Sequence, residues 1–253
     1  MGSISTAGEP QLLAPEEKKK SAASYLYTIA FVGLLLAFSY LGQDRVGKMQ
    51  SGGSHIRLYC FQIIWEFILL GLVWIGARLA NLKFRDLIGG RWQSFESALL
   101  DFVIAIGFWG VSLAVLVGLA HLIGLADPSR VDEAKRLLRA IGPRSLTELL
   151  FWVLLSSSAG FCEEIIFRGY LQRQFSSLVG NVWIGMLVSA CIFGLSHGYE
   201  GSRRMLLIAV YGALFGALTI WRKSLRPGMI AHAWHDSFEG AAGFFLERSG
   251  MLK

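Results

Sequence analysis

The chain is organised as long apolar stretches separated by short polar connections. Each stretch is long enough, or nearly so, to cross a bilayer as a helix, which takes about 20 residues. The stretches cover residues 25–42, 57–77, 98–124, 148–162, 182–197, 205–221 and 228–245. This pattern predicts an all-α fold: a polytopic membrane helix bundle of about seven transmembrane helices, with six to eight as the range.

The connection at 125–145 has a different pattern, in which apolar residues recur at helical spacing with charges between them. These apolar positions are Val131, Ala134, Leu137, Leu138 and Ile141. Asp127 or Ser129 would cap the start of such a helix, and Gly142-Pro143 would end it. We therefore expect an amphipathic helix lying on the membrane surface.

Composition supports the membrane interpretation, because 54% of the residues are hydrophobic, only 17% are charged and the mean hydropathy is +0.50. The net charge of +6 fits anionic lipid headgroups, and no aromatic-interleaved basic patch indicates nucleic acid. The 24 Lys and Arg residues divide evenly between the two sides of seven spans, so they do not orient the chain. We expect a multi-pass protein of the bacterial plasma membrane whose partners include membrane lipids.

No internal repeat or linker divides the chain, which predicts one transmembrane domain over residues 24–247. The polar residues 1–23 are expected to form a disordered tail. The three cysteines are odd in number and lie in apolar stretches, so disulfides are not expected. Nothing in the sequence indicates the oligomeric state.

Ionisable residues inside the predicted spans need an explanation, because a charge at the bilayer centre costs about 2.5–3.5 kcal/mol on insertion scales. Asp101 and His121 lie near the ends of the third span, where they can reach the interface. Glu66 lies deep in the second span without a local cation. It is a protonated core residue, a partner for Arg168 or a carboxylate of a site, and the sequence does not decide among these.

The segment FCEEIIFRGY at 161–170 places two adjacent carboxylates in an apolar helix. Glu164 and Arg168 are four apart and share a face, which predicts an ion pair. Glu163 points about 100° away and has no comparable partner on its own helix. One interpretation is a structural polar network between helices; the other is a functional site.

Two later spans also carry polar residues at helical spacing. Phe193 and His197 share a face, as do His232 and Asp236, whereas His235 pairs with Glu239 on another face. Such imidazoles and carboxylates can line one polar cavity and suit either a divalent metal or a water activated by a carboxylate base. Cys162 is poorly suited to act as a nucleophile, because apolar surroundings and neighbouring carboxylates disfavour a thiolate.

Three motifs in order, Glu163-Glu164-x-x-x-Arg168, Phe193-x-x-x-His197 and His232-x-x-x-Asp236, resemble the CAAX protease and bacteriocin-processing family of intramembrane proteases, which includes the type II CAAX prenyl proteases. The resemblance covers about residues 145–245, which would be the protease-like core. It implies an endopeptidase acting on membrane-held peptide or protein substrates, including prenylated CAAX-type ones.

The resemblance also implies a role for each motif residue. Glu163 would be the base that activates water, and His197 would hold or polarise that water. His232 and Asp236 would complete the site, and Glu164 with Arg168 would be a supporting ion pair. A metal such as Zn²⁺ would be held by Glu163, His197, His232 and Asp236; a glutamate and histidine mechanism without a catalytic metal has also been argued for this family.

Two other functions stay open at this stage. The acid and histidine cluster suits a cation or proton transporter, and relatives with the same fold include non-catalytic, bacteriocin-immunity-type membrane proteins. A shared site also needs a particular geometry, because simply alternating spans would place Glu163 and His197 toward opposite surfaces. We therefore expect residues 167–180 to continue the helix of Glu163 beyond the hydrocarbon or to lie at its surface. The next span would then start outside the membrane and bring His197 only to mid-depth.

Overall fold

The computed structural model describes residues 22–48, 54–127, 129 and 131–250, and their regular structure is entirely helical. The helices up to the third long span are α1 (Ala22–Lys48), α2 (Ile56–Leu79), α3 (Phe84–Ile88) and α4 (Phe95–Leu122). The remaining elements are α5 (Val131–Ile141), α6 (Leu146–Glu163), the π-helix η2 (Glu164–Leu171), α7 (Gln172–Val179), α8 (Val182–Ser196), the 3₁₀-helix η3 (Gly198–Glu200), α9 (Ser202–Arg222) and α10 (Arg226–Arg248). The predicted tail lies outside the described residues except for its last two positions, and the single domain stays a prediction.

Each of the seven predicted apolar stretches forms a helix, apart from residues 123, 124 and 197 at the ends of two of them, which confirms the polytopic helical bundle. Five of the described helical segments are long and apolar enough to cross a membrane, and they make the chain an integral membrane protein. They are Ala22–Leu41, Ile56–Leu79, Phe95–Leu122, Leu146–Val179 and Ser202–Arg222. The other two stretches differ for physical reasons: α8 has only 15 residues, and α10 carries the polar residues of the third motif.

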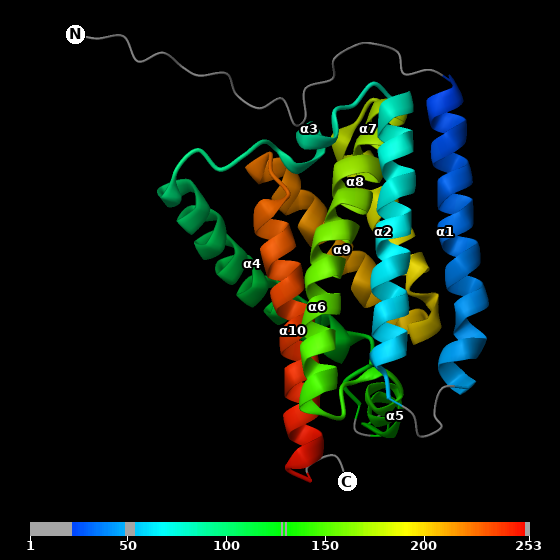
Figure 1. The fold of residues 1–253 in the computed structure, drawn as a ribbon, viewed down its shortest axis with the longest axis vertical. Helices are drawn as coiled ribbons and strands as arrows, with labels where there is room; N and C mark the ends of the chain where they lie inside the picture. Colours follow the sequence, from blue (N-terminus) through cyan, green and yellow to red (C-terminus); the bar gives the residue numbers. More distant parts are fainter. Residues whose placement is uncertain (1–21, 49–53, 128, 130, 251–253) are drawn as a thin grey trace.

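The segment from α6 to α7 is the centre of the bundle. In its most apolar window 44% of the residues are buried, against 11% in α4, which leans away at one edge of the molecule (Figure 1). Helices α1, α2, α6 and α10 run side by side along the long axis (Figure 1). The first motif therefore lies on the helix with the most protein around it.

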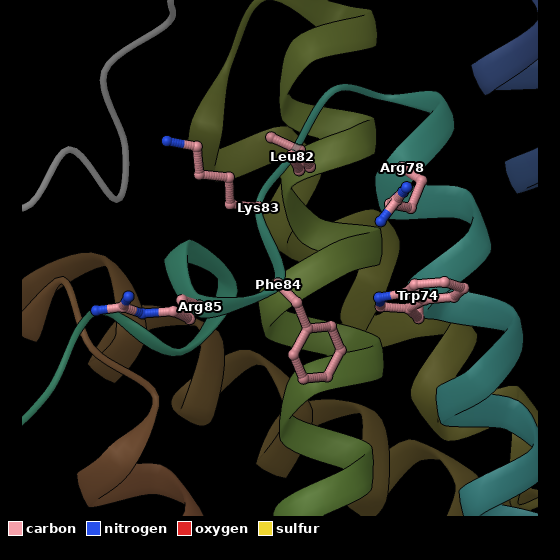
Figure 2. A pocket seen from close by; sticks show the side chains of 6 residues that line it. All are labelled: Trp74, Arg78, Leu82, Lys83, Phe84 and Arg85. Atoms are coloured by element: carbon pink, nitrogen blue, oxygen red, sulfur yellow. The ribbon is translucent and has the colours of Figure 1, made fainter.

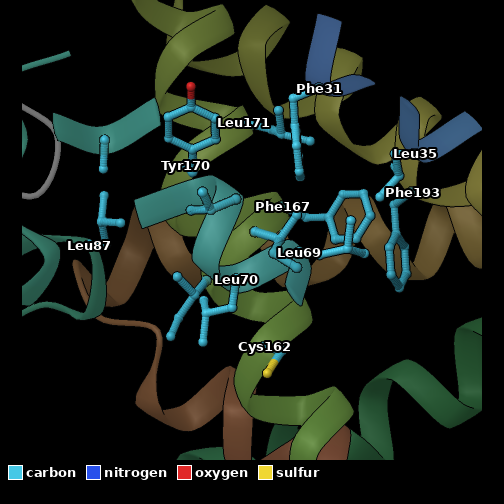
Figure 3. Close-up of a cluster of buried hydrophobic side chains, with 14 of the residues drawn as sticks. Phe31, Leu35, Leu69, Leu70, Leu87, Cys162, Phe167, Tyr170, Leu171 and Phe193 are labelled. Atoms are coloured by element: carbon cyan, nitrogen blue, oxygen red, sulfur yellow. The ribbon is translucent and has the colours of Figure 1, made fainter. Parts of the chain in front are cut away.

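A hydrophobic cluster surrounds η2, and each of the eight residues of this π-helix is buried. Figure 3 shows Phe167, Tyr170 and Leu171 of η2 packed among side chains of the neighbouring helices. Phe31 and Leu35 come from α1, Leu69 and Leu70 from α2, Leu87 from α3 and Phe193 from α8. Because this packing fixes η2 from several sides, the charged residues within it are held inside protein rather than against lipid.

Glycines allow α6 and α10 to approach each other closely. A Cβ atom on Gly160 would lie 2.7 Å from the backbone nitrogen of Ala233 and 2.8 Å from the carbonyl oxygen of Met229. Trp152 fits against Gly240, and its indole N–H donates to the carbonyl oxygen of Asp236 at 2.7 Å. Small residues at a helix contact are the common solution for close packing within membranes, and here they bring the first and third motifs together.

The predicted helix at 131–141 is present as α5 and ends at Gly142, whose N–H donates to Leu138 at 2.7 Å. Its end is held by α2, because the Tyr59 hydroxyl donates to the carbonyl oxygen of Ile141 at 2.6 Å. His55 Nδ1 also lies 2.9 Å from the carbonyl oxygen of Gly142. The surface helix is therefore anchored to the start of a transmembrane helix; its place on the membrane surface stays a prediction.

Asp101 differs from the expectation that it reaches the interface. Its side chain is buried and accepts from Trp92 Nε1 at 2.8 Å, from Arg222 at 3.0 Å and from Arg226 at 3.1 Å. These cations stand at the end of α9 and the start of α10, where spacing along α4 gives no hint of them. The buried carboxylate of Asp101 thus ties α4, α9 and α10 together through ion pairs with two partly exposed arginines.

Candidate active site

The ion pair of the first motif is present. Arg168 Nη1 donates to Glu164 Oε1 at 2.8 Å, and both side chains are almost fully buried. Arg168 also donates to the carbonyl oxygen of Gly212 at 3.2 Å, and its guanidinium carbon lies 4.4 Å from the centroid of the Phe193 ring. The pair confirms the prediction from the four-residue spacing, although these residues lie in a π-helix rather than an α-helix.

His232 joins the first motif to the third. Its Nδ1 lies 3.0 Å from Glu164 Oε1, the same oxygen that binds Arg168. Because Glu164 is paired with a guanidinium it is a carboxylate, so Nδ1 carries the proton of this hydrogen bond. Glu164 therefore orients the imidazole as well as neutralising Arg168, a contact between α10 and η2 that no spacing along one helix indicates.

The other nitrogen of His232 faces the two remaining acids. Nε2 lies 3.7 Å from Glu163 Oε2 and 3.5 Å from Asp236 Oδ2. The two carboxylates are also the more accessible groups: the Glu163 side chain is 16% exposed and that of Asp236 is 29% exposed, whereas that of Glu164 is fully buried. Adjacent glutamates thus flank one imidazole, and of the two only Glu163 has an exposed side chain.

His197 stands directly after α8, and among the described residues it forms no hydrogen bond or ion pair with Glu163, Glu164 or Asp236. Its Nδ1 lies 2.9 Å from the carbonyl oxygen of Phe193, which can only accept, so Nδ1 carries a proton and Nε2 is left with a free lone pair. The Phe193 ring lies between the two imidazoles, 4.9 Å from His197 and 6.2 Å from His232 by ring centroids. The second motif therefore approaches the other two through its phenylalanine.

The expected continuation of the fourth helix explains how these residues meet. Helix α6 runs on through η2 and α7, and α8 starts again after two residues at the same end of the bundle (Figure 1). Helix α8 ends part-way along the bundle in that view, and His197 directly follows its last residue (Figure 1). The short length of α8 is what produces this placement.

Glu66 on α2 is a fourth carboxylate close to the cluster, beside Glu163, Glu164 and Asp236. It is 3% exposed and accepts a hydrogen bond from Ser158 on α6. The charges of Glu163, His232 and Asp236 all act on it. Of the roles left open by the sequence, the partner of Arg168 is wrong, because Arg168 donates to Glu164 and to the carbonyl oxygen of Gly212 instead. Cys162 is fully buried in the hydrophobic cluster, where it packs as a small apolar side chain.

His235 forms a second polar group on the neighbouring face of α10. Its Nε2 lies 3.3 Å from Glu239 Oε1, as the spacing predicts, and its Nδ1 accepts from the indole N–H of Trp109 at 3.2 Å. An accepting Nδ1 leaves the proton on Nε2, so His235 is a neutral donor to Glu239. Trp109 lies on α4, and the sequence offered no signal for this contact.

The 3₁₀-helix η3 contributes two residues that sequence reasoning did not single out. Burial raises the pKa of Tyr199 well above its usual value, and the charges of Glu200, Glu163 and Asp236 raise it further. Burial also raises the pKa of Glu200, against the opposing charges of His197 and Arg204. Tyr199 is thus a neutral hydroxyl in the field of Glu163 and Asp236.

The fit of a metal ion can be judged from the donor atoms. His232 Nδ1 is committed to Glu164, and His197 Nδ1 to a backbone carbonyl, which leaves their Nε2 atoms and the carboxylates of Glu163 and Asp236. In the part of the chain that the structure describes, no group of three or more His, Cys, Asp or Glu side chains is arranged to hold a metal ion. The residues as placed do not form a metal centre, and Zn²⁺ stays a prediction from the resemblance.

Comparison with known families addresses the segment that carries this cluster. Residues 145–238 match the model of the family described as "Type II CAAX prenyl endopeptidase Rce1-like". The match includes Glu163, Arg168, His197, His232 and Asp236. No curated protein and no solved structure shows a significant match. The segment that brings the three motifs together is therefore similar to this family of CAAX prenyl endopeptidases.

Proposed function

We propose that this protein is an intramembrane endopeptidase in which Glu163 activates the attacking water. The observation that carries the proposal is the meeting of Glu163 and Asp236 at one nitrogen of His232, whose other nitrogen is held by the buried pair of Glu164 and Arg168. The family match supports a protease of the membrane. The proposal goes beyond this match by assigning a role to each residue of the site.

Glu163 is suited to the role of base because its side chain is partly exposed and is not paired with a guanidinium. Its neighbour Glu164 binds Arg168, so the two acids differ in chemistry although they are adjacent in sequence. Glu163 would take a proton from a water molecule as that water attacks the scissile carbonyl, and would then give the proton to the leaving amine. The free lone pair of His197 Nε2 would accept the second hydrogen bond of the same water.

His232 would stabilise the oxyanion that forms on the attacked carbonyl. An imidazole with carboxylates at both nitrogens is favoured in its protonated form, which is a donor at both positions. Nε2–H faces Glu163 and Asp236 before the reaction and can donate a hydrogen bond to the developing negative charge. Glu164 acts as a positioning residue, because it touches His232 and Arg168 rather than the accessible side of the cluster.

The expected substrate is a peptide held at the membrane. The cluster lies within a bundle whose outer faces carry exposed large apolar side chains, so a substrate must reach it from the bilayer or from its surface. The family description names prenyl endopeptidases of the CAAX type. A prenylated peptide is therefore the first substrate to test, beside an unprenylated transmembrane peptide.

Cleavage by purified protein in proteoliposomes tests the proposal directly. Wild type, Glu163→Gln and Glu96→Gln are compared on a fluorogenic, prenylated CAAX peptide, since Glu96 is an acid at the start of α4 outside the cluster. We expect Glu163→Gln to lower the rate by about 10²- to 10⁴-fold, the usual size of a general base contribution. Glu96→Gln should cleave as wild type does. Equal cleavage by wild type and Glu163→Gln would overturn the assignment of Glu163.

Metal content is measured on the same samples. An active preparation with far less than one metal ion per chain, unaffected by a chelator, supports a base mechanism without metal. One ion per chain whose removal abolishes cleavage and whose return restores it would instead support the zinc prediction. The same proteoliposomes test the transporter alternative. Accumulation of metal ions inside them, without cleavage of either peptide, would favour transport.

A further inference from the structure

A cavity of about 370 Å³ lies away from the candidate active site, between the end of α2 and the start of α3. Its lining residues are Trp74, Arg78, Leu82, Lys83, Phe84 and Arg85. Three of these six are cations and none is an acid. Figure 2 shows Arg78 and Trp74 directed from α2 toward the segment of Leu82 and Phe84, while the charged ends of Lys83 and Arg85 point to the other side of that segment.

The positive charge of this cavity is not neutralised by the described part of the protein. Among the described residues, Arg78, Lys83 and Arg85 have no ion pair with an acid. Asp86, the nearest acid along the chain, interacts instead with Arg173 of α7, which also donates to its backbone carbonyl oxygen at 2.6 Å. Unpaired cations around a concave site attract an anion, and a guanidinium binds phosphate oxygens particularly well.

The position of the cavity indicates where that anion comes from. Arg78 lies in the last turn of a predicted span, and its guanidinium carbon lies 5.0 Å from the centroid of the Trp74 ring. Tryptophan and arginine at the end of a transmembrane helix lie at the level of the lipid headgroups. A phosphate at this level would accept from the Arg78 guanidinium and from the indole N–H of Trp74, for which no partner occurs among the described residues.

The same face of α2 also offers a path for an acyl chain. Gly71 precedes Trp74 by three residues and Arg78 by seven, so all three lie close to one line along the helix. A Cβ on Gly71 would meet no atom within 4 Å, which leaves an open place on the surface. Phe67, one turn earlier, is 51% exposed, and Trp74 is 48% exposed. Two exposed aromatic rings with a gap between them provide an apolar surface below the phosphate position.

We infer that this cavity binds the phosphate of an anionic phospholipid, with Arg78 and Trp74 contacting the phosphate and the gap at Gly71 receiving an acyl chain. Lys83 and Arg85 add positive potential from the other side of the segment and favour lipids with net negative charge over zwitterionic ones. Leu82, Phe84 and Ile88 pack against the hydrophobic cluster around η2. A lipid bound here would therefore contact and stabilise the segment from Leu82 to Ile88, which packs against the cluster around η2.

Lipid binding to the full-length protein in detergent is measured by native mass spectrometry. The probes are phosphatidylglycerol and phosphatidylcholine with identical acyl chains, and inorganic phosphate is added as a competitor. We expect tighter binding of phosphatidylglycerol to wild type, and about fivefold weaker binding to Arg78→Gln, which corresponds to about 1 kcal/mol per cation at the membrane surface. Arg57→Gln, an exposed arginine at the other end of α2, is the matched control and should bind as wild type does.

A second variant separates the lipid from a free anion. Gly71→Leu fills the open place without changing any charge, so it should weaken phosphatidylglycerol binding while the protein keeps its thermal unfolding temperature. Millimolar inorganic phosphate should not displace the lipid. Equal binding of both lipids, unchanged binding by Arg78→Gln, or full displacement by phosphate together with no effect of Gly71→Leu would each overturn the assignment of an anionic lipid.

Discussion

The buried pair of Glu164 and Arg168 gives the sharpest test of how this bundle is held together. Arg168→Met keeps an unbranched side chain of similar length but removes the charge, leaving the Glu164 carboxylate buried with only His232 as a partner. Removing one member of a buried ion pair costs about 3–5 kcal/mol, since the other charge stays desolvated without compensation. Loss of the contacts of the guanidinium with Phe193 and Phe215, at 4.4 and 5.0 Å, adds to this cost.

The double variant decides whether charge, rather than packing, is responsible. Glu164→Gln added to Arg168→Met removes the stranded charge, and its amide oxygen can still accept from His232. Because a neutral replacement of a buried pair is often close to isoenergetic, we expect the double variant to regain at least half of the lost free energy of unfolding. Such a recovery gives a coupling energy that is measured by the double-mutant cycle.

Thermal unfolding in detergent, followed by tryptophan fluorescence at one scan rate, measures these effects. With about 2–4 °C per kcal/mol for a domain of this size, Arg168→Met should lower Tm by roughly 6–20 °C. Arg57→Gln provides the control for removing an exposed arginine and should stay within about 0.5 kcal/mol of wild type. An Arg168→Met protein that unfolds within 1 °C of wild type, or a double variant less stable than the single one, would refute the reasoning.

Three further predictions use the same measurement of thermal unfolding. Gly160→Ala pushes α6 away from the backbone of α10 and should lower the free energy of unfolding by about 1–3 kcal/mol. Gly110→Ala is the control, because its new Cβ meets open space on α4 and should not lower stability. Equal Tm values for the two variants would contradict close packing of α6 on α10. Ser158→Val removes the hydrogen-bond donor of the buried Glu66 and should lower the free energy of unfolding by about 1–3 kcal/mol. If that hydrogen bond is the cause, the same substitution must lower stability less in a protein that already carries Glu66→Leu. Burial raises the pKa of Glu200, so the folded protein binds this proton more tightly than the unfolded chain; stability from this group is full below its unfolded pKa of about 4.3 and falls as pH rises through the raised value. Glu200→Gln should flatten that decline between pH 4 and pH 7, and identical slopes in the two proteins would show that another group titrates.

Local spacing predicted the contacts that lie within one helix. Glu164 with Arg168, His232 with Asp236 and His235 with Glu239 are each four residues apart, and each pair is in contact. The apolar stretches likewise predicted the helices, because crossing a bilayer requires both length and hydropathy. These features depend on neighbours along the chain, which a sequence displays directly.

Contacts between different helices could not be predicted from the sequence in the same way. The hydrogen bond from His232 to Glu164 and the partners of Asp101 depend on which helices pack together and at what depth. The π-helix at Glu164–Leu171 also has no signal in composition, because it follows from how its eight buried residues fit between their neighbours. The family resemblance predicted which motifs meet; it did not predict that Glu164 would hold both a guanidinium and an imidazole.

The two bonds of Glu164 also differ in when they can form during synthesis. Arg168 follows Glu164 by four residues and emerges from the ribosome with it, whereas His232 is made 68 residues later. The segment of α6 and η2 can therefore enter the bilayer with its charges already paired, before α10 exists. Insertion of α10 then adds the hydrogen bond from His232 to a carboxylate that is already paired with Arg168. At no stage of synthesis does Glu164 have to enter the bilayer as an unpaired charge.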